Sequence, residues 1–245
     1  MPQPAETQLA SFPATRWTLI RRVQKGDERD AREAMEEICR QYWYPLYAFA
    51  RRRGFSAEDA EDLTQELFRR VITGETIQAA RQEHGLMRSF LLSLLKRVIS
   101  NHVRDASAKK RGGAEASTIS FNDLEAEGRY AHEPADISDA DTLFDRAWAQ
   151  GVLDAAEKNL RESFAEGNNL DGYDQLREFL PLGDNVTPYE DVARKLNISE
   201  SALRQQISRV RKRYARLIEQ EIAQTVSSPA EVKAELEHLM AVVGR

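Results

Sequence analysis

Apolar residues recur at steps of three and four along most of the chain, a spacing that places them on one face of an α-helix. The clearest repeats predict helices over residues 56–72, 88–104, 142–160 and 199–217. No stretch alternates apolar and polar residues in the way that a half-buried β-strand does. The pattern therefore predicts an all-α fold.

Residues 187–216 have the pattern of two helices around a tight turn. Thr187 is a favourable N-cap for the first helix, and Glu190 stands where it can complete a capping box. This helix is expected to end just before Ser199, which caps the second helix. The segment is thus a candidate helix-turn-helix.

The second helix of this pair has an apolar and a basic face. The apolar face consists of Leu203, Ile207, Val210, Tyr214 and Leu217. The basic face consists of Arg204, Arg209, Arg211, Lys212, Arg213 and Arg216. In a helix-turn-helix such a helix enters the major groove of DNA and presents its first turns to base edges. An ordinary helical hairpin with a solvated basic face is the alternative on spacing alone.

Two other predicted helices carry charge opposite their apolar stripe. In residues 56–72 the opposite face consists of Asp59, Asp62, Gln65, Glu66 and Arg69. In residues 88–104 it consists of Lys96, Arg97, Ser100, Asn101 and Arg104, and the basic run continues beyond the helix to Arg111. Charged faces of this kind are commonly only solvated, so neither one establishes a binding surface by itself.

Two segments carry signals that interrupt regular structure. A helix is expected to open at Asp27, with a kink or a break near Tyr44, because Pro45 has no backbone N–H to donate. Residues 114–140 are rich in acids and poor in apolar side chains, which predicts an irregular or only partly ordered tether.

The charge of the chain is sorted along the sequence. A formal net charge of -5 over 245 residues does not suggest a bulk nucleic-acid binder. However, residues 96–111 hold six basic residues against one acid, and residues 122–145 hold eight acids against one base. The local pattern therefore carries more information than the total.

Several classes of chemistry find no support in the sequence. Cys39 is the only cysteine, so an internal disulfide is impossible, and none of the four histidines is spaced as a metal-ligand pair. No phosphate-binding glycine loop or nucleophile elbow is present. We expect a protein without enzymatic activity, metal or cofactor, and the lack of a long apolar run predicts a cytoplasmic location.

Taken together, these segments resemble a bacterial sigma factor of the extracytoplasmic-function (ECF) class. The first half of sigma domain two is similar to YPLYAFARRRG followed by SAEDAEDLTQELF, and its promoter-melting half to FLLSLLKRVISNHVRDASAKKRGG. Domain four is similar to YEDVARKLNISESALRQQISRVRKRY. A planctomycete-like subgroup is indicated by TRWTLI, LFDRAWA and EIAQTVSSPAEV.

The resemblance implies two small helical domains, a sigma domain two bundle and a sigma domain four helix-turn-helix, joined by an acidic linker. The expected units are an N-terminal segment (1–24), the region 2 domain (25–113), the linker (114–141), the region 4 domain (142–224) and a C-terminal extension (225–245).

The resemblance also implies functional residues. Contacts with core RNA polymerase fall on Asp59, Glu61, Asp62, Gln65 and Glu66. Contacts with the minus-ten promoter element fall on Lys96, Arg97, Asn101, Arg104, Lys109, Lys110 and Arg111. Contacts with the minus-thirty-five element fall on Ser199, Glu200, Ser201, Arg204, Gln205, Ser208, Arg209, Lys212 and Arg213. The segment LLKRVISN departs from the aromatic–alanine–arginine–asparagine core that is commoner in the class.

The implied partners are the clamp helices of the largest polymerase subunit, the polymerase flap, promoter DNA and an anti-sigma factor, without a membrane. A protein with these partners is nucleoid-associated when polymerase holds it. One rival interpretation is a conventional helix-turn-helix regulator that binds a palindromic operator as a dimer, with residues 1–113 as its sensory domain. Another is a helical adaptor or anti-sigma-like interaction protein with no DNA role. The regulator leaves the acidic face and the second basic helix unexplained, and six basic residues on one helix opposite an apolar stripe argue against the adaptor.

Overall fold

The computed structural model describes residues 28–73, 86–108, 123–135, 137, 139–181, 187–226 and 228–244. Every regular element in these ranges is helical, which confirms the all-α prediction. None of the helices in this part of the chain is long and apolar enough to cross a membrane. The N-terminal segment 1–24 lies outside the described residues.

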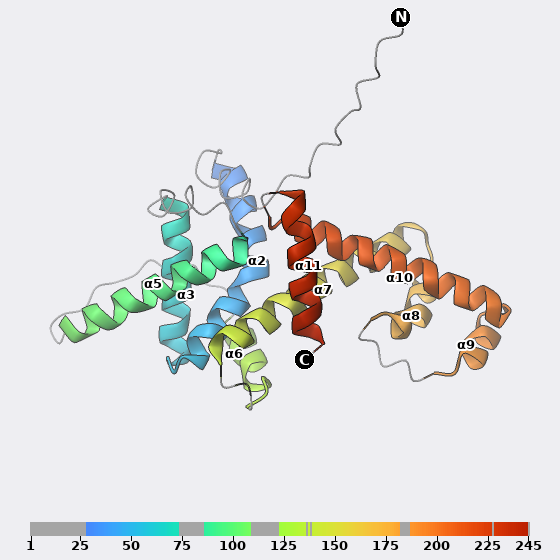
Figure 1. Ribbon diagram of the computed structural model, residues 1–245, viewed down its shortest axis with the longest axis horizontal. Helices are drawn as coiled ribbons and strands as arrows, with labels where there is room; N and C mark the ends of the chain where they lie inside the picture. The colour runs from blue at the N-terminus through green and yellow to red at the C-terminus, as the bar shows by residue number, and fades with distance from the viewer. Residues whose placement is uncertain are drawn as a thin grey trace, which may run out of the picture.

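The helices, shown in Figure 1, are α2 (Glu28–Arg52), α3 (Ala57–Thr73), α5 (Met87–Ala108), α6 (Asp123–Ala131), α7 (Ala140–Glu166), α8 (Leu170–Leu176), the 3-10 helix η1 (Arg177–Phe179), α9 (Tyr189–Lys195), α10 (Glu200–Ala223) and α11 (Pro229–Val243).

Helices α2, α3 and α5 pack around a shared apolar core. Leu63 and Leu67, which lie one turn apart on α3, are both buried, as their spacing predicts. Trp43 of α2 stacks on Phe68 of α3, with ring centroids 5.8 Å apart. Cys39 is also buried in this core, and burial raises the pKa of its thiol to about 12, so it is an unreactive apolar side chain.

A kink or a break was predicted near Tyr44; helix α2 continues through Pro45, so the break is wrong. The residues around the proline are buried from Gln41 to Ala50, so packing against neighbouring helices offsets the lost backbone hydrogen bond. The carbonyl oxygen of Gln41, which loses its usual helical donor, faces α7. A Cβ atom added to Gly151 would lie 3.8 Å from this oxygen.

The acidic segment, for which an irregular or only partly ordered tether was predicted, contains the helix α6. Glu127 of α6 accepts hydrogen bonds from Arg51 at 2.7 and 2.9 Å and from the hydroxyl of Tyr47 at 2.5 Å. The guanidinium groups of Arg51 and Arg52 lie over the ring of Tyr130. Their Cζ atoms are 5.0 and 5.6 Å from the ring centroid. Composition missed α6 because tertiary contacts with α2 order it.

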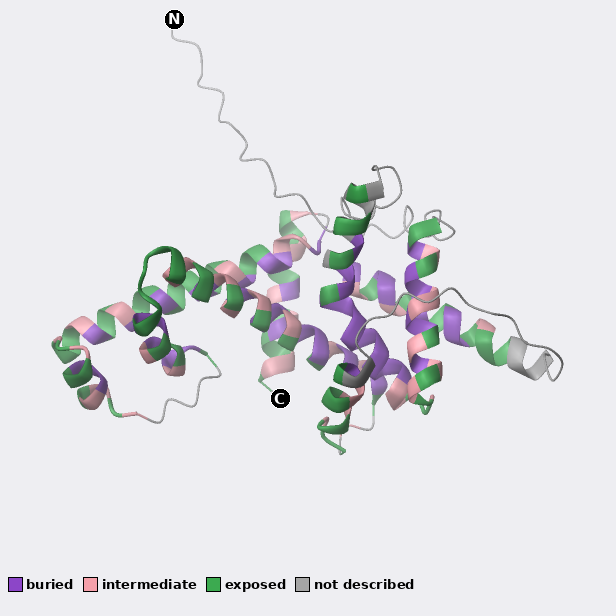
Figure 2. Cartoon of the chain, turned by 180° about the vertical axis from the view of Figure 1, so that it is seen from behind, coloured by how far each residue is buried: buried purple, intermediate pink, exposed green. Residues whose placement is uncertain are grey.

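Helix α7 connects the two ends of the molecule. Asp139 caps it by accepting a hydrogen bond from the backbone N–H of Thr142 at 2.9 Å. The helix packs on α2 along one part of its length and on α10 along another, and the buried residues of α2 and α7 lie at the centre of Figure 2. The predicted boundary between the linker and the region 4 domain, at residues 141–142, falls in the first turn of α7. The division of the chain into these two units stays a prediction.

The predicted helix-turn-helix is formed by α9 and α10. Ser199 caps α10 by accepting a hydrogen bond from the N–H of Ala202 at 3.2 Å, as predicted. Asn197 turns the chain between the helices with a φ of 53°. The predicted cap of α9 is wrong: its N-cap is Pro188, with no side-chain cap, and the N–H of Thr187 donates to Glu178 at 3.2 Å.

The C-terminal extension forms α11, which packs on both α7 and α10. Glu235 is almost completely buried, and its two carboxylate oxygens accept hydrogen bonds from Arg88 of α5 at 2.9 Å each. Arg88 also donates to Asp145 of α7 at 3.2 Å and lies over the ring of Trp148 at 5.2 Å. This cluster joins α5, α7 and α11.

Candidate nucleic-acid interface

The acidic face of α3 lies on the surface, but its charges are not all equally available. Asp62 is exposed, whereas the other four predicted contact residues are half-buried: Asp59, Glu61, Gln65 and Glu66. The amide of Gln65 donates to Glu61 at 2.6 Å. Asp62 is therefore the most open carboxylate of this face.

Glu66 lies between two arginines of its own helix. Its carboxylate accepts hydrogen bonds from Arg69 and from Arg70, each at 2.6 Å. The hydrogen bond from Arg69 is the largest cause of a lowered pKa for Glu66. The carboxylate stays ionised, but the two guanidinium groups offset its charge, so the face is less negative than its composition suggests.

The basic face of α5 carries the predicted minus-ten contacts. Lys96, Arg97 and Arg104 are exposed, and Asn101 accepts a hydrogen bond from Arg104 at 2.7 Å. Lys96 also forms an ion pair with Asp141 of α7. The remaining predicted contacts, Lys109, Lys110 and Arg111, lie outside the described residues.

The predicted minus-thirty-five contacts lie along one side of α10. All of them are exposed, from Ser199 at the cap to Arg213. On the opposite side Leu203, Ile207 and Val210 are buried. The spacing of the apolar residues therefore predicted which side chains of α10 are buried and which are exposed.

Arg204 is held by two neighbours. Its guanidinium pairs with Glu200 at 2.5 Å and lies 4.6 Å from the ring centroid of Tyr189 in α9. Tyr189 in turn stacks on Phe179 of η1, with ring centroids 5.1 Å apart. The stack limits the positions that this exposed arginine can adopt, which suits a side chain that must approach a base edge in one geometry.

Arg211 has a structural role, whereas the sequence did not decide between a structural role and a DNA contact for this residue. Its Nε donates a hydrogen bond to the carbonyl oxygen of Phe179 at 2.6 Å. The bond satisfies a backbone acceptor at the end of η1 and fixes this turn against α10. The basic face therefore includes at least one guanidinium engaged within the protein.

A comparison with protein families bears on the helices α2, α3 and α5. Residues 38–109 match the family model for Sigma-70 region 2. This stretch of the chain is similar to sigma-70 region 2. No curated protein and no solved structure matches the chain. The match supports a sigma factor family and a role in RNA polymerase binding and promoter recognition.

The region 2 match covers most of α2 together with α3 and α5. It therefore includes the acidic face of α3 and the basic face of α5. The helix-turn-helix lies outside the match, so its predicted role depends on its own geometry. Within the described ranges, no group of three or more histidine, cysteine, aspartate or glutamate residues could hold a metal ion.

Sequence reasoning missed two residues that shape these surfaces. Asp141 pairs with Lys96, and Tyr189 supports Arg204. Both act across contacts between different helices, which helical periodicity cannot reveal. The charge pattern gave one indication of the Asp141 ion pair, because Asp141 lies in the acidic residues 122–145 and Lys96 in the basic residues 96–111.

Proposed function

We propose that the protein is a sigma factor of the ECF type, from the planctomycete-like subgroup, that directs core RNA polymerase to promoters and assists their melting. The region 2 match is the observation that carries this proposal, because it spans the helices with the acidic and basic faces. Sigma factors are DNA-binding regulators rather than enzymes.

In this proposal the two domains divide the work. The acidic face of α3 docks on the clamp helices of the largest subunit, where carboxylates can pair with basic helices and orient the complex. Lys96, Arg97 and Arg104 contact phosphates of the minus-ten element, and Asn101 reads a base edge. The open side of α10 reads the minus-thirty-five element in the major groove, near the polymerase flap.

The ion pair between Lys96 and Asp141 gives the acidic segment a part in this scheme. Asp141 offsets the charge of a predicted phosphate contact, which reduces the attraction of the free protein for DNA. An anti-sigma factor would be a further control on the same surfaces. The protein would work in the cytoplasm, at the nucleoid when polymerase holds it.

A binding experiment separates this function from a conventional regulator. The protein is mixed with genomic DNA fragments in the presence and absence of purified core polymerase, and bound fragments are sequenced. A sigma factor selects specific fragments only with core polymerase. Equal selection without core, at palindromic sites, would instead establish a dimeric operator-binding regulator.

A further inference from the structure

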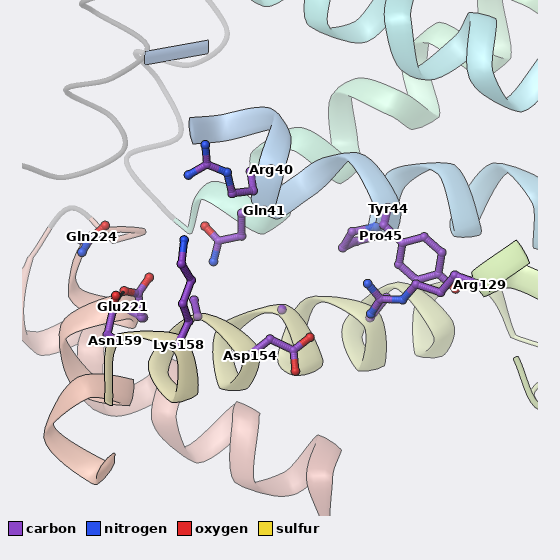
Figure 3. Close-up of a pocket in the computed structure, with 13 residues that line it drawn as sticks. Arg40, Gln41, Tyr44, Pro45, Arg129, Asp154, Lys158, Asn159, Glu221 and Gln224 are labelled. Carbon is purple, nitrogen blue, oxygen red and sulfur yellow. Dashed lines mark hydrogen bonds between the residues drawn. The ribbon is translucent and has the colours of Figure 1, made fainter. Parts of the chain in front are cut away.

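A cavity of about 400 Å³ lies outside both proposed DNA surfaces, between α2 and α7 (Figure 3). Arg129 of α6 lines one part of it, and Glu221 and Gln224 at the end of α10 line another. A volume of this size accommodates a small metabolite, since ligand cavities of proteins typically measure about 300–1,000 Å³.

The walls of the cavity carry an excess of basic side chains. Arg40 of α2, Arg129 of α6 and Lys158 of α7 line it, against the two acids Asp154 and Glu221. Glu221 is buried and accepts a hydrogen bond from Asn159 at 2.9 Å. Three separate helices thus place a cation at one cavity, which favours a negatively charged occupant.

Gln41 provides a second, independent indication of a ligand. Its side chain is only 8% exposed, and neither its amide nitrogen nor its amide oxygen has a hydrogen-bond partner among the described residues. In Figure 3 it extends from α2 into the cavity, and Lys158 reaches toward it from α7. A buried amide without partners is unfavourable, so a polar occupant that bonds to it is expected.

We propose that this cavity binds a small multivalent oxyanion, either a phosphate compound or a compound with several carboxylates. Lys158 and Arg40 offset its charge, and the amide nitrogen of Gln41 donates a hydrogen bond to one of its oxygens. Charge-assisted hydrogen bonds of this kind are among the stronger ones in proteins. The site makes no use of the proposed promoter contacts and does not depend on them.

An occupant would contact the region 2 helix α2 and the helices α7 and α10 at once. By binding the packed arrangement in preference to a separated one, it would stabilise the contact between α2 and α7. The ligand would therefore act as an effector of the arrangement that links region 2 to the helix-turn-helix.

Isothermal titration of the full chain with pyrophosphate and, separately, with citrate tests the proposal at constant ionic strength. At least one probe is expected to bind, and the one that binds more tightly distinguishes phosphate from carboxylate chemistry. Lys158→Met and Gln41→Met should each weaken binding by about tenfold or more, because each removes a hydrogen-bond donor to the anion.

Lys233→Met is the matched control. Lys158 and Lys233 are both exposed and both lie near a glutamate one turn onward, at 3.8 and 3.9 Å, but Lys233 is on α11, away from the cavity. Its replacement should leave the affinity unchanged. The proposal is overturned if neither probe binds at millimolar concentration, if either cavity variant keeps the wild-type affinity, or if Lys233→Met loses as much affinity as Lys158→Met.

Discussion

At the scale of single residues, Arg204 is a proposed DNA contact whose position two neighbouring side chains restrict. Glu200 pairs with it and Tyr189 supports it, so part of its conformational freedom is already lost in the free protein. A side chain that is ordered in advance loses less entropy on binding. Arginine can also donate two hydrogen bonds to guanine in the major groove, which makes Arg204 the strongest candidate for base recognition.

We predict that Arg204→Ala reduces promoter binding of the polymerase complex by about 1–3 kcal/mol and relaxes the preference at one base pair. Arg209→Ala, a change of the same type in the same helix, should weaken binding uniformly over all sequences because it removes a phosphate contact. Competition binding over a set of single-base promoter variants measures both effects. A uniform loss for Arg204→Ala would assign it to the backbone instead.

Asp62 carries the corresponding prediction for polymerase docking. Asp62→Lys reverses the most open charge of the acidic face and should weaken core polymerase binding by about tenfold or more, without a change in melting temperature. Glu58→Lys alters an exposed acid of the same helix that is outside the predicted contact set, and it should bind core normally. Unaltered core affinity in Asp62→Lys would rule out docking through this position.

At the scale of elements, α6 depends on one ionised carboxylate. The pKa of Glu127 is lowered, and the hydrogen bonds from Arg51 are the largest cause. The partial burial of Glu127 acts in the opposite direction and raises its pKa. Because the folded pKa lies below the unfolded one, this interaction stabilises the fold above the ordinary glutamate value of 4.5 and is lost as the pH falls through the folded value.

We therefore predict that Glu127→Gln lowers the free energy of unfolding near neutral pH and that the difference from wild type shrinks in acid. Denaturant unfolding followed across this pH range measures the difference. A difference that stays constant with pH would mean that hydrogen bonding alone, without the charge, holds α6 on α2.

Helix α11 depends on the buried ion pair between Arg88 and Glu235. Glu235→Ala leaves Arg88 paired with Asp145 but removes its buried hydrogen bonds to Glu235, so we predict that it destabilises the protein by about 1–3 kcal/mol. Glu237→Ala, on an exposed side of the same helix, should change the stability by less than about 0.5 kcal/mol. Denaturant unfolding compares the two, and equal small effects would show that α11 contributes little to the fold.

Helix periodicity predicted α3, α5, α7 and α10 because their apolar stripes are long and regular. The sequence did not decide between a kink and a break at Pro45, where burial lets α2 continue, and composition did not predict α6, which contacts with α2 hold in place. The same limit applies to the sites. Which residues share a helix face was predictable, whereas Tyr189 beneath Arg204 and Arg88 beside Glu235 depend on how separate helices pack.

At the scale of the whole molecule, charge and packing are arranged around α7. The acidic face and one basic face lie in the stretch that matches sigma-70 region 2, and the other basic face lies on the helix-turn-helix. The net charge of -5 limits the attraction of the free chain to DNA. We propose that the free chain binds DNA weakly and that polymerase supplies the remaining affinity at the two proposed promoter surfaces.

The most direct test of this account is transcription by purified core RNA polymerase on genomic promoter fragments, with and without the protein. The account predicts that transcripts with defined start sites appear only when the protein is added. It also predicts that they disappear with Asp62→Lys and change promoter preference with Arg204→Ala. Initiation that is independent of the protein, or operator binding without any initiation, would contradict a sigma factor function.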